Sequence, residues 1–268
     1  MNLLTRIFTI QRLNNPYDNI TSRNILVVGA SSGIGFAVAD LLRKSGAEVF
    51  VAARRLTVLE KNFPKHNVFE TDVTDSNEID ILFDKLVERK LQIDTVFWCP
   101  GIYTPMNFDN FNVVEAEKII TTNFLCIFKL FSLMVNYWLK DKKEFSKRSI
   151  HWVWISSVAG YRGLPGSGAY GPSKAAINNL AEASYIELKP LGINISLVCP
   201  GFVESRLTEK NKFKMPAIIS AEEAAKCILK GLKAGNFEIH FPKRFTIWLK
   251  IFKLLPNWLY FKIIKLIE

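Results

Sequence analysis

Short apolar runs alternate with helical segments along most of the chain, and this alternation is the strongest constraint on its fold. The runs at 24–28, 48–52, 68–70, 94–98, 149–155, 193–198 and 237–241 are typical of buried strands. Segments with helical periodicity separate them at 34–44, 75–89, 113–140, 169–188 and 221–233. Strands and helices that alternate in this way form parallel β-α-β units with helices on both faces. We therefore predict an α/β fold with a doubly wound, parallel, seven-stranded sheet.

The chain has 268 residues, which is enough for one large α/β domain or two small ones. No linker rich in Pro, Gly or Ser divides it, so we predict one Rossmann-like domain at 23–243. An arm at 1–22 precedes this domain, and a C-terminal amphipathic helical tail at 244–268 follows it. The arm is too short to span a bilayer and lacks a signal-peptide pattern. We expect it to pack on the domain or to be flexible, in preference to anchoring in a membrane.

Cysteine and histidine usage narrows the class of protein. The four cysteines are far apart in sequence, which indicates free thiols in a reducing compartment and favours a cytoplasmic location. The three histidines are also scattered, so we expect no metal site.

The formal net charge is +10. The tail lysines are separated by apolar residues and form no groove-like basic patch, so we expect no nucleic-acid partner.

The tail is both basic and apolar. Between His240 and the C-terminus, six Lys or Arg residues stand against Glu268, and Pro256 divides the segment into two helical pieces. Each piece has a polar stripe of lysines and a surface of Ile, Leu, Phe and Trp. Such a pair suits a membrane surface, and the protein would then lie peripherally on the inner face of a membrane. It equally suits helices that pack on the domain, wall the substrate pocket or form a dimer interface.

A glycine-rich turn follows the first strand and opens the first helix. Glycines at this place allow a tight turn and a close approach of the backbone to a pyrophosphate, which the helix N-terminus attracts. The second strand ends at Arg54 and Arg55, without the carboxylate that would bind the ribose of NAD. Two guanidiniums can instead pair with a 2′-phosphate, so we expect NADP(H) over NAD(H). The predicted phosphate-binding residues of the turn are Gly29, Ser31, Ser32, Gly33, Ile34 and Gly35.

Tyr170 and Lys174 are four residues apart in a predicted helix, so their side chains share one face. A free phenol has a pKa near ~10 and is a poor acid or base at neutral pH. A nearby ammonium favours the phenolate and brings the phenol toward useful proton transfer. Ser156 and Ser157 precede this pair and end another predicted strand. Together with the glycine-rich turn, these residues predict proton-transfer chemistry beside a dinucleotide.

These motifs resemble the classical short-chain dehydrogenase/reductase family from Asn24 to Phe241. By this resemblance, Tyr170 would give or take the proton of a carbonyl or alcohol, and Ser157 would hydrogen-bond the substrate oxygen. Lys174 would hold the nicotinamide ribose and lower the pKa of Tyr170. Asn123 would bind a water that relays protons from Lys174. The resemblance adds further cofactor contacts at Asp72, Val73, Gly101, Pro200, Gly201, Val203 and Ser205.

The resemblance implies an NADP(H)-dependent oxidoreductase that interconverts a carbonyl and a secondary alcohol, and family members are commonly homo-oligomers. The segment at 208–219 mixes lysines with apolar residues, which suggests a lid with an apolar underside. We therefore expect a small hydrophobic, lipid-like substrate. The family usually has Asn-Ala-Gly where this chain has Cys99-Pro100-Gly101. Cys99 hydrogen-bonds more poorly than Asn, and Pro100 lacks a backbone N–H. This departure leaves an alternative, a cofactor-binding sensor or scaffold with little or no turnover, which the complete Ser157, Tyr170 and Lys174 set disfavours.

Overall fold

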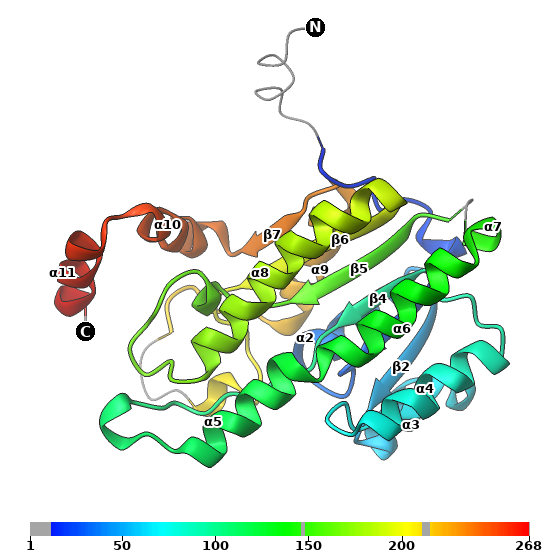
Figure 1. Ribbon diagram of the computed structural model, residues 1–268, viewed down its shortest axis with the longest axis horizontal. Helices are drawn as coiled ribbons and strands as arrows, with labels where there is room; N and C mark the ends of the chain where they lie inside the picture. The colour runs from blue at the N-terminus through cyan, green and yellow to red at the C-terminus, as the bar shows by residue number, and fades with distance from the viewer. Residues whose placement is uncertain (1–11, 146–147, 211–214, 268) are drawn as a thin grey trace, which may run out of the picture.

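Seven parallel strands form the centre of the computed structural model, which describes residues 12–145, 148–210 and 215–267 (Figure 1). Their order is β3-β2-β1-β4-β5-β6-β7, and each neighbouring pair is parallel. This order confirms the doubly wound, seven-stranded sheet that the alternation predicts. The strands are β1 (Asn24–Val28), β2 (Glu48–Ala53), β3 (Val68–Glu70), β4 (Thr95–Trp98), β5 (Ile150–Ile155), β6 (Ile193–Pro200) and β7 (Glu238–Phe241).

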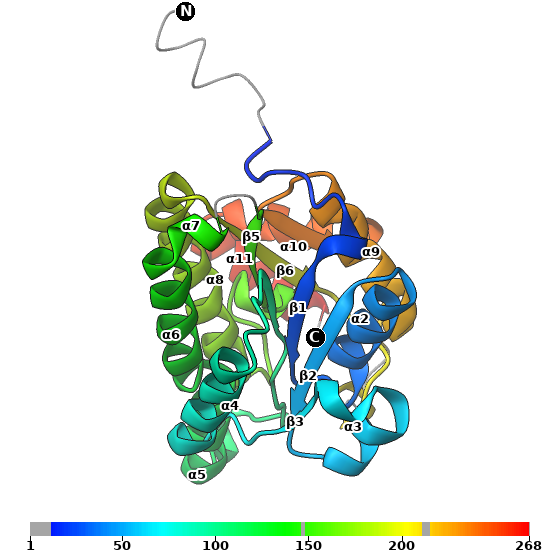
Figure 2. The same cartoon turned by 90° about the vertical axis from the view of Figure 1, so that its right-hand side faces the viewer.

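Helices cover both faces of the sheet (Figure 2). On one face lie α2 (Gly33–Lys44), α3 (Leu56–Asn62) and α9 (Ala221–Lys233), and on the other lie α4 (Ser76–Glu88), α5 (Val113–Ile120), α6 (Ile127–Lys140) and α8 (Tyr170–Leu188). The short α7 (Lys142–Phe145) follows α6. Each face has its own apolar core, so central strands such as β4 and β5 are buried on both sides. This double burial explains why the strands are continuous apolar runs in the sequence.

Two helical segments differ from the sequence-based expectation. The sequence does not predict helix α3, because a seven-residue helix that buries only Leu59 has little hydrophobic periodicity to detect. The stretch at 113–140 is not one regular α-helix, since a π-helical turn at Thr121–Leu125 separates α5 from α6. By length and composition Val113–Lys140 could cross a membrane, but here it lies along the sheet and buries Ile127 and Leu130.

The described part of the arm packs on the domain. Asn14 donates from its backbone N–H to the Gly235 carbonyl at 3.0 Å, and Tyr17 is fully buried. Residues 1–11 of the predicted arm lie outside the described residues. At the other end, α10 (Lys243–Leu254) and α11 (Asn257–Ile267) form the helical extension, and Pro256 separates them as expected. Short 3₁₀ turns complete the chain at Ile20–Ser22, Lys65–Asn67, Phe108–Asn110, Val158–Gly160, Lys189–Leu191 and Thr208–Lys210.

Candidate active site

A cleft of about 690 Å³ lies at the carboxyl ends of the strands, where the strand order reverses between β1 and β4. In open α/β sheets this switch point is the usual place for a ligand. The structure brings nearly all the candidate residues together here, and Asn123 is the exception. The candidates that line the cleft are Gly29, Ser31, Ser32, Gly33, Ile34, Gly35, Arg54, Arg55, Asp72, Val73, Gly101, Ser157, Tyr170, Lys174, Pro200, Gly201, Val203 and Ser205.

The glycine-rich turn leads from β1 into α2 and leaves no room for a side chain at Gly29 or Gly35. Gly29 has a positive φ of 82°, and a Cβ placed there would lie 2.8 Å from the Pro100 nitrogen. A Cβ on Gly35 would lie 2.5 Å from the Gly29 carbonyl oxygen and 3.1 Å from the Cβ of Cys99. Ser32 precedes α2 without a side-chain cap, so the first amides of the helix remain as donors at the cleft. Cys99 and Pro100 therefore pack directly against this turn.

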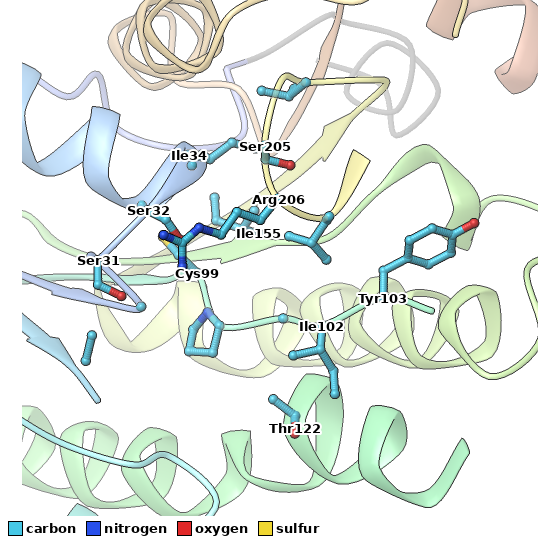
Figure 3. A pocket seen from close by; sticks show the side chains of 18 of the residues that line it. Ser31, Ser32, Ile34, Cys99, Ile102, Tyr103, Thr122, Ile155, Ser205 and Arg206 are labelled. Carbon is cyan, nitrogen blue, oxygen red and sulfur yellow. The ribbon is translucent and has the colours of Figure 1, made fainter. Parts of the chain in front are cut away.

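Three arginines gather beside the turn, which suits a phosphate group. Arg55 donates from Nη2 to the hydroxyls of Ser31 at 2.9 Å and Ser32 at 2.8 Å. Burial, then the charges of Arg206 and Arg54, lower the pKa of Arg55. Figure 3 shows the Arg206 side chain extending toward Ser31 and Ser32. Sequence reasoning missed Arg206, although a cation directly after the motif at 200–205 was the available signal.

Arg54 faces a different partner. Its guanidinium lies 3.7 Å from a carboxylate oxygen of Asp72, and its side chain is 65% exposed. Asp72 also accepts hydrogen bonds from the backbone N–H and the hydroxyl of Thr74. Partial burial raises the pKa of Asp72, but these bonds and the charge of Arg54 outweigh it, so the net shift is downward. Asp72 is thus held ionised at the cofactor end of the cleft.

At the other end of the cleft, Tyr170 begins α8 and Ser157 follows β5, and the Ser157 hydroxyl is close enough to affect the pKa of the phenol. The Ser157 hydroxyl oxygen also accepts from the Ala159 amide at 3.1 Å, which fixes its position. Burial raises the pKa of Tyr170 to about 12, and the Ser157 hydroxyl acts in the opposite direction. Ser157 is therefore a neighbour that lowers this pKa, and the expected lowering by Lys174 stays a prediction. Ser156 points away, bonding Asn178 at 2.6 Å.

Lys174 lies one helical turn beyond Tyr170 and is 4% exposed. Its ammonium donates to the Ile155 carbonyl at 3.0 Å and lies 5.7 Å from the centre of the Tyr170 ring. Burial lowers the pKa of Lys174 to about 8. The ammonium is therefore still mainly charged at neutral pH, inside the cleft and beside the phenol.

Asn123 lies behind the cleft, in the π-helical turn between α5 and α6. Its side chain accepts from the Ile102 amide at 2.7 Å and donates to the Ile102 carbonyl and the Ser173 hydroxyl at 3.0 Å. A Cβ on Gly101 would lie 3.5 Å from the Lys174 ammonium and 3.7 Å from the Asn123 oxygen. Asn123 thus ties the loop after β4 to α8, close to Lys174. π-helical turns often occur at functional sites.

The cleft walls near Tyr170 are apolar and were not predicted. Ile102, Tyr103 and Ile155 line the cleft here, and Leu207 is a further apolar residue of its lining. The ring of Tyr103 meets that of Tyr170 edge-on, with centres 5.0 Å apart. Ser205 donates from its amide to the Thr208 hydroxyl at 3.0 Å and lies beside the glycine-rich turn, since a Cβ on Gly33 would be 3.6 Å from the Ser205 Cβ. Of the expected lid, 211–214 lie outside the described residues.

Comparison with known proteins identifies the family. A model of the short chain dehydrogenase family matches residues 23–215. An uncharacterised oxidoreductase of Myxococcus xanthus is 31% identical over 242 residues, covering 88% of this chain and 93% of the relative. A 3-ketodihydrosphingosine reductase of Mus musculus is 29% identical over 237 residues, covering 80% of this chain and 69% of that protein.

Solved structures agree with the fold. A short chain dehydrogenase from Burkholderia cenocepacia, in complex with NADP, superposes with a TM-score of 0.72 at 18% sequence identity, covering 89% of this chain and all of that chain (100%). At this sequence identity, the superposition shows only that the two chains share a fold. The family model, the relatives and the sheet lead to the same conclusion: the chain belongs to the short chain dehydrogenase family and is an NAD(P)-dependent oxidoreductase.

Proposed function

We propose that the protein uses NADPH to reduce a carbonyl group on an apolar, lipid-like substrate, or catalyses the reverse oxidation with NADP⁺. The observation that carries this proposal is the half-buried Tyr170 phenol, beside Ser157 and close to the Lys174 ammonium, in the same cleft as the glycine-rich turn. A proton donor and a cofactor cradle in one cleft are what carbonyl reduction requires.

The preference for NADP(H) rests on charge. Arg55 and Arg206 are like charges held close together beside Ser31 and Ser32, an arrangement that an anion stabilises. The end of β2 carries no carboxylate that would repel a 2′-phosphate. The 2′-phosphate of NADP(H) would accept from the Arg55 guanidinium and the two serine hydroxyls, and the diphosphate would lie against the first amides of α2.

When bound, NADPH supplies the hydride that reaches the carbonyl carbon. Negative charge then develops on the carbonyl oxygen, and the hydroxyls of Ser157 and Tyr170 are the donors that stabilise it. Tyr170 gives its proton to that oxygen and completes the alcohol. Lys174 holds the ribose next to Tyr170, and its ammonium stabilises the phenolate that forms. Asn123 keeps the Gly101–Ile102 loop and α8 together, and a water on it would return a proton.

The substrate class follows from the walls near Tyr170. Ile102, Tyr103 and Ile155 offer apolar surface near the Tyr170 phenol. The mouse relative carries the name 3-ketodihydrosphingosine reductase. A lipid-linked ketone is therefore the first substrate to test.

The test is NADPH oxidation by the purified protein with 3-ketodihydrosphingosine and shorter hydrophobic ketones. We expect Tyr170→Phe to lower kcat on the order of 100-fold to 10,000-fold, because it removes the general acid. NADPH fluorescence checks that the variant still binds cofactor. Turnover that survives this substitution would refute the role of Tyr170. NADPH binding without turnover of any ketone would favour the alternative, a sensor or scaffold.

A further inference from the structure

Both α10 and α11 carry large apolar side chains that are exposed. We propose that this surface, the tail face, binds a membrane rich in anionic lipids. On α10 the exposed apolar positions recur at helical spacing, and α11 adds further exposed apolar residues beyond Pro256. Trp248 and Trp258 are 60% and 70% exposed. The tail face consists of Ile247, Trp248, Ile251, Leu254, Trp258, Phe261 and Leu266.

The tail face is held in place by the opposite side of the two helices. Phe245 stacks on Phe202 with ring centres 5.5 Å apart, and Thr246 is fully buried. Arg162, from the domain, donates to the carbonyls of Phe252 and Leu255 at 2.7 and 2.6 Å, where α10 ends. It also lies over the Tyr260 ring at 4.0 Å. The helices thus already use one side for packing, and the exposed apolar side needs another occupant.

Charge identifies that occupant. Every ionisable residue from 243 to 266, Tyr260 aside, is basic: Lys243, Arg244, Lys250, Lys253, Lys262 and Lys265. Within the described residues, Lys250 pairs with Glu238 at 2.7 Å, and no carboxylate lies within ion-pair distance of the other five. Exposed tryptophans with flanking cations match the interfacial region of an anionic bilayer, where rings sit at headgroup depth and lysines meet phosphates.

A second copy of the chain fits this surface less well. A two-fold symmetric interface would bring each basic helix pair against its equivalent, so Arg244, Lys262 and Lys265 would face like charges. Like charges across an interface oppose association. An anionic lipid surface neutralises the same residues, and we therefore assign the tail face to lipid.

The position of the tail face also has a consequence for catalysis, and this consequence rests on the proposed function. Figure 1 shows α10 and α11 beyond the carboxyl ends of β5 and β7, the edge of the sheet at which the cleft opens. A Cβ on Gly201, which lines the cleft, would lie 2.9 Å from the Phe245 ring. Binding through the tail face would therefore hold the cleft beside the bilayer, where a ketone dissolved in the lipid reaches it directly.

The experiment is sedimentation of the full chain with vesicles of phosphatidylcholine alone or of equal phosphatidylcholine and phosphatidylserine. We expect binding to the anionic vesicles only. Trp248→Ser with Trp258→Ser should weaken it on the order of 100-fold, since each ring loses its buried area. Lys262→Ala with Lys265→Ala should weaken it roughly 25-fold. Matched controls, Ile81→Ser with Ile186→Ser and Lys61→Ala with Lys85→Ala, change exposed residues elsewhere and should bind as the parent does.

The proposal would be overturned if the double substitution of Trp248 and Trp258 did not weaken vesicle binding, or if the parent did not bind anionic vesicles. Sedimentation velocity without lipid gives the subunit count, and a loss of subunits in the tryptophan variant alone would assign the tail face to a second copy instead. Activity measurements distinguish a failure of the membrane proposal from a failure of the proposed carbonyl reduction. With both correct, the variant loses turnover of vesicle-embedded 3-ketodihydrosphingosine but keeps that of a water-soluble ketone. Vesicle binding without any turnover would refute only the proposed function.

Discussion

At the scale of single residues, burial at the Tyr170 end of the cleft disfavours the charged form of the phenol. The phenol is surrounded by Ser157 and the Tyr103 ring, and burial raises its pKa to about 12. It is therefore a neutral phenol at physiological pH, which is the form that can donate a proton to a carbonyl oxygen. In the proposed mechanism the reverse reaction needs the phenolate, so the same burial would favour reduction and limit oxidation at neutral pH.

The two directions should respond differently to pH. Below the pKa of Tyr170, the phenolate fraction rises about tenfold per pH unit. We expect kcat for alcohol oxidation to rise with that slope between about pH 5 and about pH 7, below the pKa of about 8 of Lys174. Over the same range kcat for ketone reduction should stay flat, because the phenol remains protonated and the Lys174 ammonium remains charged. Initial rates in both directions at saturating cofactor give the two profiles. An oxidation rate that does not change with pH would contradict this role of Tyr170.

The two adjacent arginines should contribute unequally to cofactor choice. Arg55 bonds Ser31 and Ser32, whereas Arg54 is exposed and faces Asp72. We expect Arg55→Ala to raise the KM for NADPH roughly 10-fold to 100-fold, since hydrogen bonds to a charged group are lost. The KM for NADH should change little, and Arg54→Ala should have the smaller effect. Steady-state kinetics with both cofactors measure this, and equal rises for NADPH and NADH would refute the 2′-phosphate contact.

At the scale of elements, the sequence predicts what depends on local pattern and misses what depends on packing. The strands are predicted because burial on both faces makes each an apolar run, as in β4 and β5. Helix α3 buries only Leu59 and so leaves no pattern. The π-helical turn at Asn123 is invisible for another reason: the Ile102 and Ser173 contacts that surround it come from distant segments.

The same division holds within the site. The glycine-rich turn and the Ser157, Tyr170 and Lys174 set occur at characteristic spacings, and they lie together in the cleft. Arg206 and Tyr103 have no such spacing. Each reaches the cleft from a loop beyond a strand end, and only the assembled sheet brings those loops together. The roles of Arg54 and Arg55 also separate only once their partners, Asp72 and the two serines, are in place.

At the scale of the whole molecule, the cleft draws on both halves of the sheet. The turn after β1 and the end of β2 line one end of the cleft, the segments after β4 and β5 line the Tyr170 end, and the segment after β6 adds Arg206 beside the turn. A dinucleotide in this cleft contacts both halves at once, and the unfolded chain offers no such site. Cofactor binding should therefore stabilise the entire fold rather than one loop.

This linkage predicts a cofactor-dependent melting temperature. A ligand at a hundred times its Kd adds about 2.7 kcal/mol to the free energy of unfolding. For a chain of this size that corresponds to a rise in Tm of about 5 to 10 °C. At one fixed concentration, NADPH should raise Tm more than NADH does, because only NADPH offers a phosphate to Arg55 and the two serine hydroxyls. Calorimetry on the parent and on Arg55→Ala tests both statements. The difference between the cofactors should nearly vanish in the variant, and equal shifts for the two cofactors in the parent would show that the arginine cluster does not select NADPH.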